Sequence, residues 1–319
     1  MAKSNGKKSK KGVIIGIIAV IAVIAVIGGS GDGKDKDKDS SSKAKIVSVD
    51  SSSKSNDTKK KVEKDDEKSN TEPSMTIDEQ VLWEVDGLKL TATGLSEDKL
   101  FGSAINVLAE NNSDKDIGIG ADAVIVNDYM ISDLTSITVT AGNKANDEIT
   151  LFSSALNAAG IEHIGKVELY LHTFDPDTYM TISNSDCITI KTSDYDKMDT
   201  QNDIDGAVLY DQDGVKIMCK YVDENSFWGS AVLMYVENNT DKNIIVQCDE
   251  VSVNGFMVDA LMSSDVYAGK KAIDDITILQ SSLDDNGITS IDTIETSFKI
   301  LDENFTEIAN SGKVSFSTK

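Results

Sequence analysis

The same sequence pattern occurs twice in this chain, at a constant offset of 127 positions. Residues 109–133 are AENNSDKDIGIGADAVIVNDYMISD, and residues 236–260 are VENNTDKNIIVQCDEVSVNGFMVDA. Residues 102–116 match residues 229–243 at eight of fifteen positions without a gap. Solenoid repeats span only about 20–50 residues, so repeats of this length predict tandem globular domains.

Each copy has the pattern of an antiparallel β protein. Apolar residues alternate in LKLTATGL and VKIMCKYV, and Asn-Asp or Asn-Gly lies between apolar residues in VNDYM and VNGFM, which predicts hairpins. SSALNAAGI and SSLDDNGI predict one short helical turn with a serine N-cap and a glycine at C′. Six to eight short strands in each copy predict a β-sandwich.

The order of these motifs resembles a known class of surface protein. The motifs are a DG-strand, E-N-N-[ST]-D-K, V-N-[DG]-[YF]-M, A-G-[NK]-K-A and S-S-x-L. They resemble the immunoglobulin-like surface domains of unknown function in Gram-positive bacteria, which follow a membrane segment and a polar linker. The resemblance implies an all-β fold of two tandem immunoglobulin-like sandwiches, at 76–193 and 205–319, joined by a linker at 194–204. It implies no catalytic residues.

The N-terminal region predicts a membrane anchor. A basic tail (1–11) with five lysines precedes the uncharged segment 12–29, whose length suits the hydrocarbon core of a bilayer. The positive-inside rule keeps the tail in the cytoplasm and places the rest outside. A cleaved signal peptide is the alternative. The Ser/Lys/Asp-rich segment 30–75 predicts a disordered linker.

Charge excludes nucleic acid as a partner. The chain has 31 lysines, no arginine and 54 acidic residues, a net charge of −23. Residues 1–74 contain 16 lysines and 11 acidic residues, a net of +5, which leaves −28 for residues 75–319. Such a surface repels phosphate backbones.

The residues do not form an evident catalytic or cofactor motif, so we expect no enzyme, cofactor or metal. His163 and His172 have no histidine counterpart in the second copy, and surface positions account for them. The Asp-rich turns lack EF-hand spacing. Whether the aspartates between the copies (Asp194, Asp196, Asp199, Asp203, Asp205) hold a bridging cation such as calcium stays open.

Aromatic residues at strand starts are the candidate partner contacts. Phe101 lies in LFGSA, and Phe227 and Trp228 lie in FWGSA. Packing in the core or a turn is the structural alternative. If they are exposed on a loop tip, they suit a surface protein or a glycan.

Two cysteines occur only in the second copy. Cys219 and Cys248 occupy the positions of Ala92 and Ala121, on the inward face of two strands. An oxidising exterior permits a disulfide between them, and two buried thiols are the alternative. Cys187 has no cysteine counterpart, and we expect it to stay free.

These features predict a single-pass cell-membrane protein with most of the chain extracytoplasmic. We expect a binding or adhesion module without catalysis. The alternative is a structural spacer with no specific ligand.

Overall fold

The computed structural model of the protein describes residues 75–98, 102–132, 134–198, 205–226 and 229–317. These belong to one compact unit, residues 68–319. The predicted tail and transmembrane segment, and all but the last residue of the predicted linker, lie outside the described residues. No helix within the described ranges is long and apolar enough to cross a membrane.

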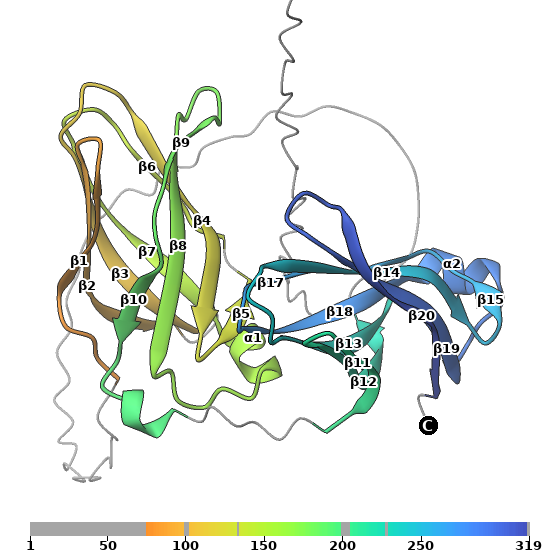
Figure 1. Cartoon of the computed structure of the whole chain (residues 1–319). Coiled ribbons are helices and arrows are strands. Elements are labelled where there is room, and N and C mark those ends of the chain that lie inside the picture. Colours follow the sequence, from red (N-terminus) through yellow and green to blue (C-terminus); the bar gives the residue numbers. More distant parts are fainter. Residues whose placement is uncertain (1–74, 99–101, 133, 199–204, 227–228, 318–319) are drawn as a thin grey trace, which may run out of the picture. The chain divides into compact units, whose positions relative to one another are not determined.

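The first repeat is a sandwich of two antiparallel sheets (Figure 1). One sheet has the order β1-β2-β3-β7, formed by Gln80–Val85, Leu88–Asp98, Gly102–Asn111 and Lys144–Phe152. The other sheet contains β4 (Ile117–Val126), β5 (Tyr129–Ile131), β6 (Ser136–Val139), β8 (Lys166–Phe174), β9 (Thr181–Asn184) and β10 (Ile188–Lys191). In it, β4 pairs with β5, β6 and β8, while β8 also pairs with β9 and β10.

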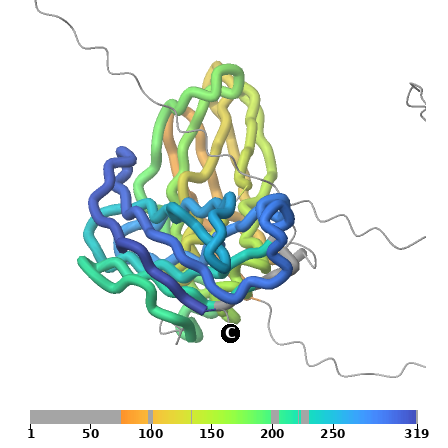
Figure 2. Tube along the Cα trace, turned by 90° about the vertical axis from the view of Figure 1, so that its right-hand side faces the viewer, coloured from red at the N-terminus to blue at the C-terminus, as the bar shows by residue number. Residues whose placement is uncertain are grey.

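The second repeat is built in the same way. One sheet has the order β11-β12-β13-β18, formed by Ala207–Gln212, Val215–Ser226, Gly229–Asn238 and Lys271–Leu279, and β16 (Ala260–Leu261) pairs with β18. The other contains β14 (Ile244–Val253), β15 (Phe256–Met257), β17 (Ser263–Val266), β19 (Thr293–Leu301) and β20 (Glu307–Ser317). The β19–β20 hairpin is the blue pair of antiparallel tubes in Figure 2.

The element bounds reproduce the offset seen in the sequence. Seven elements of the first repeat begin and end 127 positions before their counterparts: β1, β3, β4, β6, β7, β8 and the helix α1 (Ser153–Ala158) precede β11, β13, β14, β17, β18, β19 and α2 (Gln280–Asp285). Towards the end of each repeat the correspondence changes, because the single strand β20 replaces β9 and β10. The 3-10 helix η1 (Tyr195–Lys197) follows the first repeat.

The strand order is that of an immunoglobulin sandwich. After the β2–β3 hairpin, the chain crosses to the other sheet as β4 and returns as β7 to pair with β3. It then crosses again through α1, and β8 pairs with β4. The second repeat follows the same Greek-key path. The chain is therefore all-β, with two tandem immunoglobulin-like sandwiches, as the sequence predicts.

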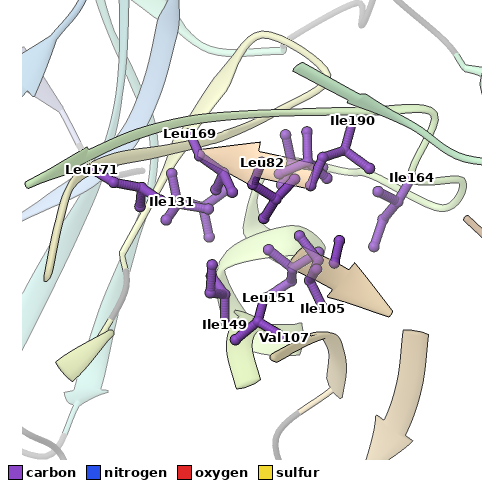
Figure 3. Packing of buried hydrophobic residues seen from close by; sticks show 14 of the residues in the cluster. Leu82, Ile105, Val107, Ile131, Ile149, Leu151, Ile164, Leu169, Leu171 and Ile190 are labelled. Carbon is purple, nitrogen blue, oxygen red and sulfur yellow. The ribbon is translucent and has the colours of Figure 1, made fainter. Parts of the chain in front are cut away.

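Alternate residues of the facing strands fill each sandwich. On β8, Val167, Leu169 and Leu171 are buried, and the residues between them are half-buried. Figure 3 shows Leu169, Leu171 and Ile190 directed towards side chains of the facing sheet, which include Ile105, Val107, Ile149 and Leu151. The alternation that predicted the strands is therefore the alternation that forms the core.

The two predicted hairpins form at the Asn-Asp and Asn-Gly positions. Asn127 and Asp128 have φ angles of 48° and 70°, and Asn254 and Gly255 have φ angles of 52° and 85°. Two successive residues with positive φ are typical of a type I′ turn, whose twist matches that of the flanking strands.

The first asparagine of each E-N-N motif is a buried hydrogen-bonding centre. Asn111 is 1% exposed. Its Nδ2 donates to the carbonyl oxygens of Lys115 (2.7 Å) and Val139 (2.9 Å), and its Oδ1 accepts from the backbone N–H and the hydroxyl of Ser113. Asn238 makes the same bonds to Lys242, Val266 and Thr240 in the second repeat. The motif thus fastens the loop after the third strand to the end of β6 or β17.

The asparagine of each V-N-[DG] turn has a similar role. Asn127 donates to the carbonyl oxygen of His163 and accepts from the N–H groups of Gly165 and Lys166. Asn254 makes the corresponding bonds to Ser290, Asp292 and Thr293. The repeated asparagines therefore hold the sandwich together.

The short helices confirm the predicted C′ glycine and correct the predicted N-cap. Gly160 and Gly287 have φ angles of 70° and 66°. In α1, the N–H groups of Gly160 and Ile161 donate to Asn157 and Leu156, which is a Schellman motif. The predicted serine N-cap is wrong. The N-cap positions are Phe152 and Leu279, without a side-chain cap, because the preceding strand continues directly into the helix.

We predict that Asn111→Ala destabilises the first repeat by roughly 2–4 kcal/mol, because buried backbone groups lose their partners. Urea unfolding of the fragment 68–319 measures this effect. Asn112→Ala is the matched control, since Asn112 is adjacent and exposed. Equal stability of the two variants would contradict the structural role of Asn111.

Candidate interaction surface

The predicted partner contacts Phe101, Phe227 and Trp228 lie outside the described residues, so their role stays a prediction. Asp199 and Asp203 of the aspartate cluster also lie outside. Asp194 accepts from Lys197 Nζ (2.9 Å) and lies 3.2 Å from His163 Nδ1. Within the described ranges, no group of three or more His, Cys, Asp or Glu residues has the geometry to hold a metal ion.

The two repeats contact each other through strand pairing, ion pairs and aromatic rings. The N-terminal end of β18 pairs in parallel with β5, with Tyr129 beside Lys271 and Met130 beside Ala272. The N–H of Lys271 donates to the carbonyl oxygen of Asp128 at 2.9 Å. This pairing joins strands of both repeats into one eleven-stranded sheet.

Four charged side chains surround this strand pairing. Lys270 Nζ of the second repeat lies 2.7 Å from Asp128 Oδ1 and 2.5 Å from Glu168 Oε2 of the first. Lys166 Nζ lies 2.8 Å and 3.2 Å from the same two oxygens. Each lysine therefore bridges both carboxylates, and we call this arrangement the ion cluster.

Burial and ion pairing act in opposite directions on the ion cluster. Burial tends to raise the pKa of Asp128, but its bonds to Lys166 and Lys270 outweigh burial and lower that pKa. Burial likewise tends to lower the pKa of both lysines, and the carboxylates raise it instead. Asp128 and the two lysines are thus held in their charged forms near neutral pH.

Aromatic and apolar side chains complete the junction. The rings of Tyr170 and Tyr267 meet edge to face, 4.9 Å between centroids. The rings of Tyr129 and Tyr235 are tilted relative to each other, with their centroids 6.5 Å apart. Met218 and Tyr235 of the second repeat are buried in the core cluster of the first. The first repeat therefore binds the second with one face of the sheet that contains β4, β5 and β8. We call this face the docking face, and it is formed by Asp128, Tyr129, Met130, Glu168 and Tyr170.

The equivalent face of the second repeat is exposed. Phe256 and Met257 occupy the positions of Tyr129 and Met130, and they are 50% and 62% exposed, whereas Tyr129 is 2% exposed. Glu295, the counterpart of Glu168, forms an ion pair with Lys313. Next to them is a polar hollow of about 510 Å³, lined by Asp249, Glu250, Ser252, Met257, Thr296, Ser297, Asn310, Gly312 and Lys313.

The lining of the hollow differs from the first repeat at a position where a small residue replaces a large one. Ser297 stands where the first repeat has Tyr170. In β14 a bulge between Asp249 and Ser252 bends the strand, and Glu250 has a φ angle of 51°. Sequence reasoning did not identify this surface, although the Tyr-to-Ser difference between the copies was a usable signal.

One inward-facing carboxyl of the second repeat is strongly perturbed. Asp274 lies on β18 in line with buried Ala272 and Ile276, and burial raises its pKa to about 6. A raised folded-state pKa means that this group stabilises the fold below about pH 4, and that this contribution is lost as the pH rises through 6. Asp274 is not among the residues of the hollow.

The cysteines are free thiols in the structure, Cys187 exposed, Cys219 buried and Cys248 half-buried. Cys219 belongs to the core cluster of the second repeat, and Cys248 packs against it. Burial raises the pKa of both of these thiols to about 11. The pairing of Cys219 with Cys248 stays a prediction.

Comparison with known proteins identifies no family. No protein-family model and no curated protein matches the chain. Similar solved structures include the Salmonella enterica SafA pilin with its SafB chaperone (14% identity, TM-score 0.22, covering 74% of this chain and 98% of that one). The YadV chaperone is 9% identical with a TM-score of 0.21, and the match covers 67% of this chain and 91% of that one. A partial N-terminal region of the enterococcal surface protein is 10% identical with a TM-score of 0.18, and the match covers 78% of this chain and 97% of that one. The immunoglobulin-like assignment therefore rests on strand order.

We predict that Asp128→Asn lowers the stability of the fragment 68–319 at pH 7 by roughly 1–3 kcal/mol, because two charged hydrogen bonds are lost. The folded-state pKa of Asp128 lies below the unfolded value of about 3.9, so its contribution is full above that value and disappears as the pH falls below it. Urea titrations from pH 7 to pH 2 test this, with the exposed Asp114→Asn as control. A difference that persists at pH 2 would exclude ionisation of Asp128 as the cause.

We also predict that protein made in an oxidising compartment contains a Cys219–Cys248 disulfide and a free Cys187. The bond closes a loop of about 30 residues and stabilises the fold by roughly 3 kcal/mol. Mass spectrometry of a non-reduced digest decides the pairing. A Cys219 peptide alkylated without prior reduction would contradict it.

Proposed function

We propose that this protein is a non-enzymatic binding or adhesion module of the bacterial cell surface. In this proposal residues 12–29 anchor the chain in the membrane as an uncleaved signal anchor, and residues 30–75 tether the two sandwiches outside the cell. The partner binds to the face of the second repeat that is equivalent to the docking face, which contains Phe256 and Met257, and to the hollow next to it.

One observation carries the proposal: the first repeat already uses this face to bind a folded domain. Tyr129 and Met130 lie at the junction, and their counterparts Phe256 and Met257 are exposed. An exposed aromatic and a methionine beside a polar hollow combine apolar contact with directional hydrogen bonds, as binding sites do.

The hollow offers donors and acceptors on three strands. Ser252 and Ser297 provide hydroxyl groups, Asn310 an amide, and Lys313 an ammonium group. Such a mixture fits a surface protein segment or a wall glycan. A ligand that binds to these residues lies against β14, β19 and β20, beside β15.

We predict that the immobilised fragment 68–319 captures a partner from purified wall glycans or surface proteins, and that Met257→Lys lowers this binding at least about tenfold, as expected when a central apolar contact is replaced by a charge. Val208→Lys is the matched control, because Val208 is 53% exposed on β11, in the other sheet. Surface plasmon resonance measures both variants.

Binding that is unaffected by Met257→Lys would place the partner site elsewhere and reject this face. A spacer is the second candidate function, favoured by the ion cluster and strand pairing that hold the repeats together. A spacer predicts that neither variant changes any interaction, because no partner is captured.

A further inference from the structure

The junction between the repeats is heterologous, since it joins two different surfaces. The first repeat contributes its docking face, and the second contributes an edge, which is the N-terminal end of β18. Because the repeats have the same elements, the chain has a second copy of each surface. Heterologous contacts of this kind link subunits head to tail when they recur between molecules, into closed rings or open chains.

The second copy of the edge is the N-terminal end of β7. Lys144 and Ala145 occupy the positions of Lys271 and Ala272. Among the described residues, β7 pairs only with β3, whereas β18 pairs with β13, β5 and β16. Lys144 is exposed. The edge that binds β5 in the second repeat is therefore open in the first.

The residues whose backbones pair at the junction are the same or similar in both repeats. The docking face has Tyr-Met in one repeat and Phe-Met in the other, and the edge has Lys-Ala in both. Strand pairing needs only backbone groups and compatible side chains, so both partners of a second junction are present on every chain.

We propose that copies of this chain associate head to tail. In this arrangement β15 of one chain pairs in parallel with β7 of the next, with Phe256 beside Lys144 and Met257 beside Ala145. The inference rests on the proposed function, because it assigns the partner of the exposed docking face: a second copy of the chain.

The association is weaker than the junction within the chain. Gly255 stands in place of Asp128, and Asn143 stands in place of Lys270, so the ion cluster is not reproduced. The net charge of −28 on residues 75–319 also opposes self-association at low ionic strength. Anchoring in a membrane raises the local concentration and offsets this weakness.

Cysteine cross-linking of the full chain tests the register. The native cysteines are first replaced as Cys187→Ser, Cys219→Ala and Cys248→Ala, since alanine occupies the last two positions in the first repeat. Chains with Phe256→Cys are then mixed with chains carrying Lys144→Cys and oxidised. The matched control carries Glu148→Cys, which is exposed on the same strand but four residues out of register.

We predict roughly fivefold more disulfide-linked dimer for Lys144→Cys than for Glu148→Cys, because a disulfide forms only between closely placed Cβ atoms. Equal yields from the two mixtures, or no dimer from either, would overturn the proposed register.

A gain of affinity provides the second test. The second junction lacks three of the four charges of the ion cluster, because Thr293 stands in place of Lys166, and Gly255→Asp with Asn143→Lys restores the other two. Asp128 already adopts this turn position with a φ angle of 70°, and a Cβ at Gly255 meets no atom within 4 Å. We predict that sedimentation of the full-chain double variant at physiological salt shows association roughly five- to tenfold tighter than wild type. Unchanged association would contradict the proposal.

The two proposals fail differently. If no cross-linked dimer forms but Met257→Lys still lowers capture of another partner, the head-to-tail inference fails and the proposed function stands. If cross-linking succeeds in register and no other partner is captured, self-association is the function of this face.

Discussion

Each sandwich depends on a buried asparagine amide at the end of its third strand. Asn111 and Asn238 are almost fully buried, and each satisfies backbone groups of two different loops. Leaving such groups without partners is costly, so this position tolerates few alternatives. The E-N-N motif is therefore repeated because the fold of each sandwich needs this asparagine.

With the shared motifs assigned to the fold, the functional difference lies where the copies diverge. Tyr170 and Ser297 occupy equivalent positions, as do Asp128 and Gly255. In the first repeat the larger and charged residues bind the second repeat. In the second repeat the smaller residues lie at a polar hollow that is lined by exposed Met257. One face thus serves an internal contact in one copy and is open to solvent in the other.

Sequence periodicity predicted the strands, the hairpins and the C′ glycines because these depend on neighbouring residues. The junction could not be predicted in this way. Asp128 and Lys270 are 142 positions apart and occupy non-equivalent places in the two repeats, so neither alternation nor the repeat offset relates them. The serine N-cap failed for a related reason, since strand β7 runs directly into α1. The partner contacts predicted at Phe101, Phe227 and Trp228 lie outside the described residues.

The junction between the repeats depends most on the pairing of β5 with β18, and one amide group reports on this pairing. The N–H of Lys271 donates to Asp128 across the junction. Hydrogen exchange measured by NMR in the fragment 68–319 should show this amide protected as strongly as its neighbours on β18, and exchanging rapidly after Asp128→Pro and Tyr129→Pro substitutions that disrupt β5. Rapid exchange of the Lys271 amide in the unsubstituted fragment would show that the repeats are not joined in this way.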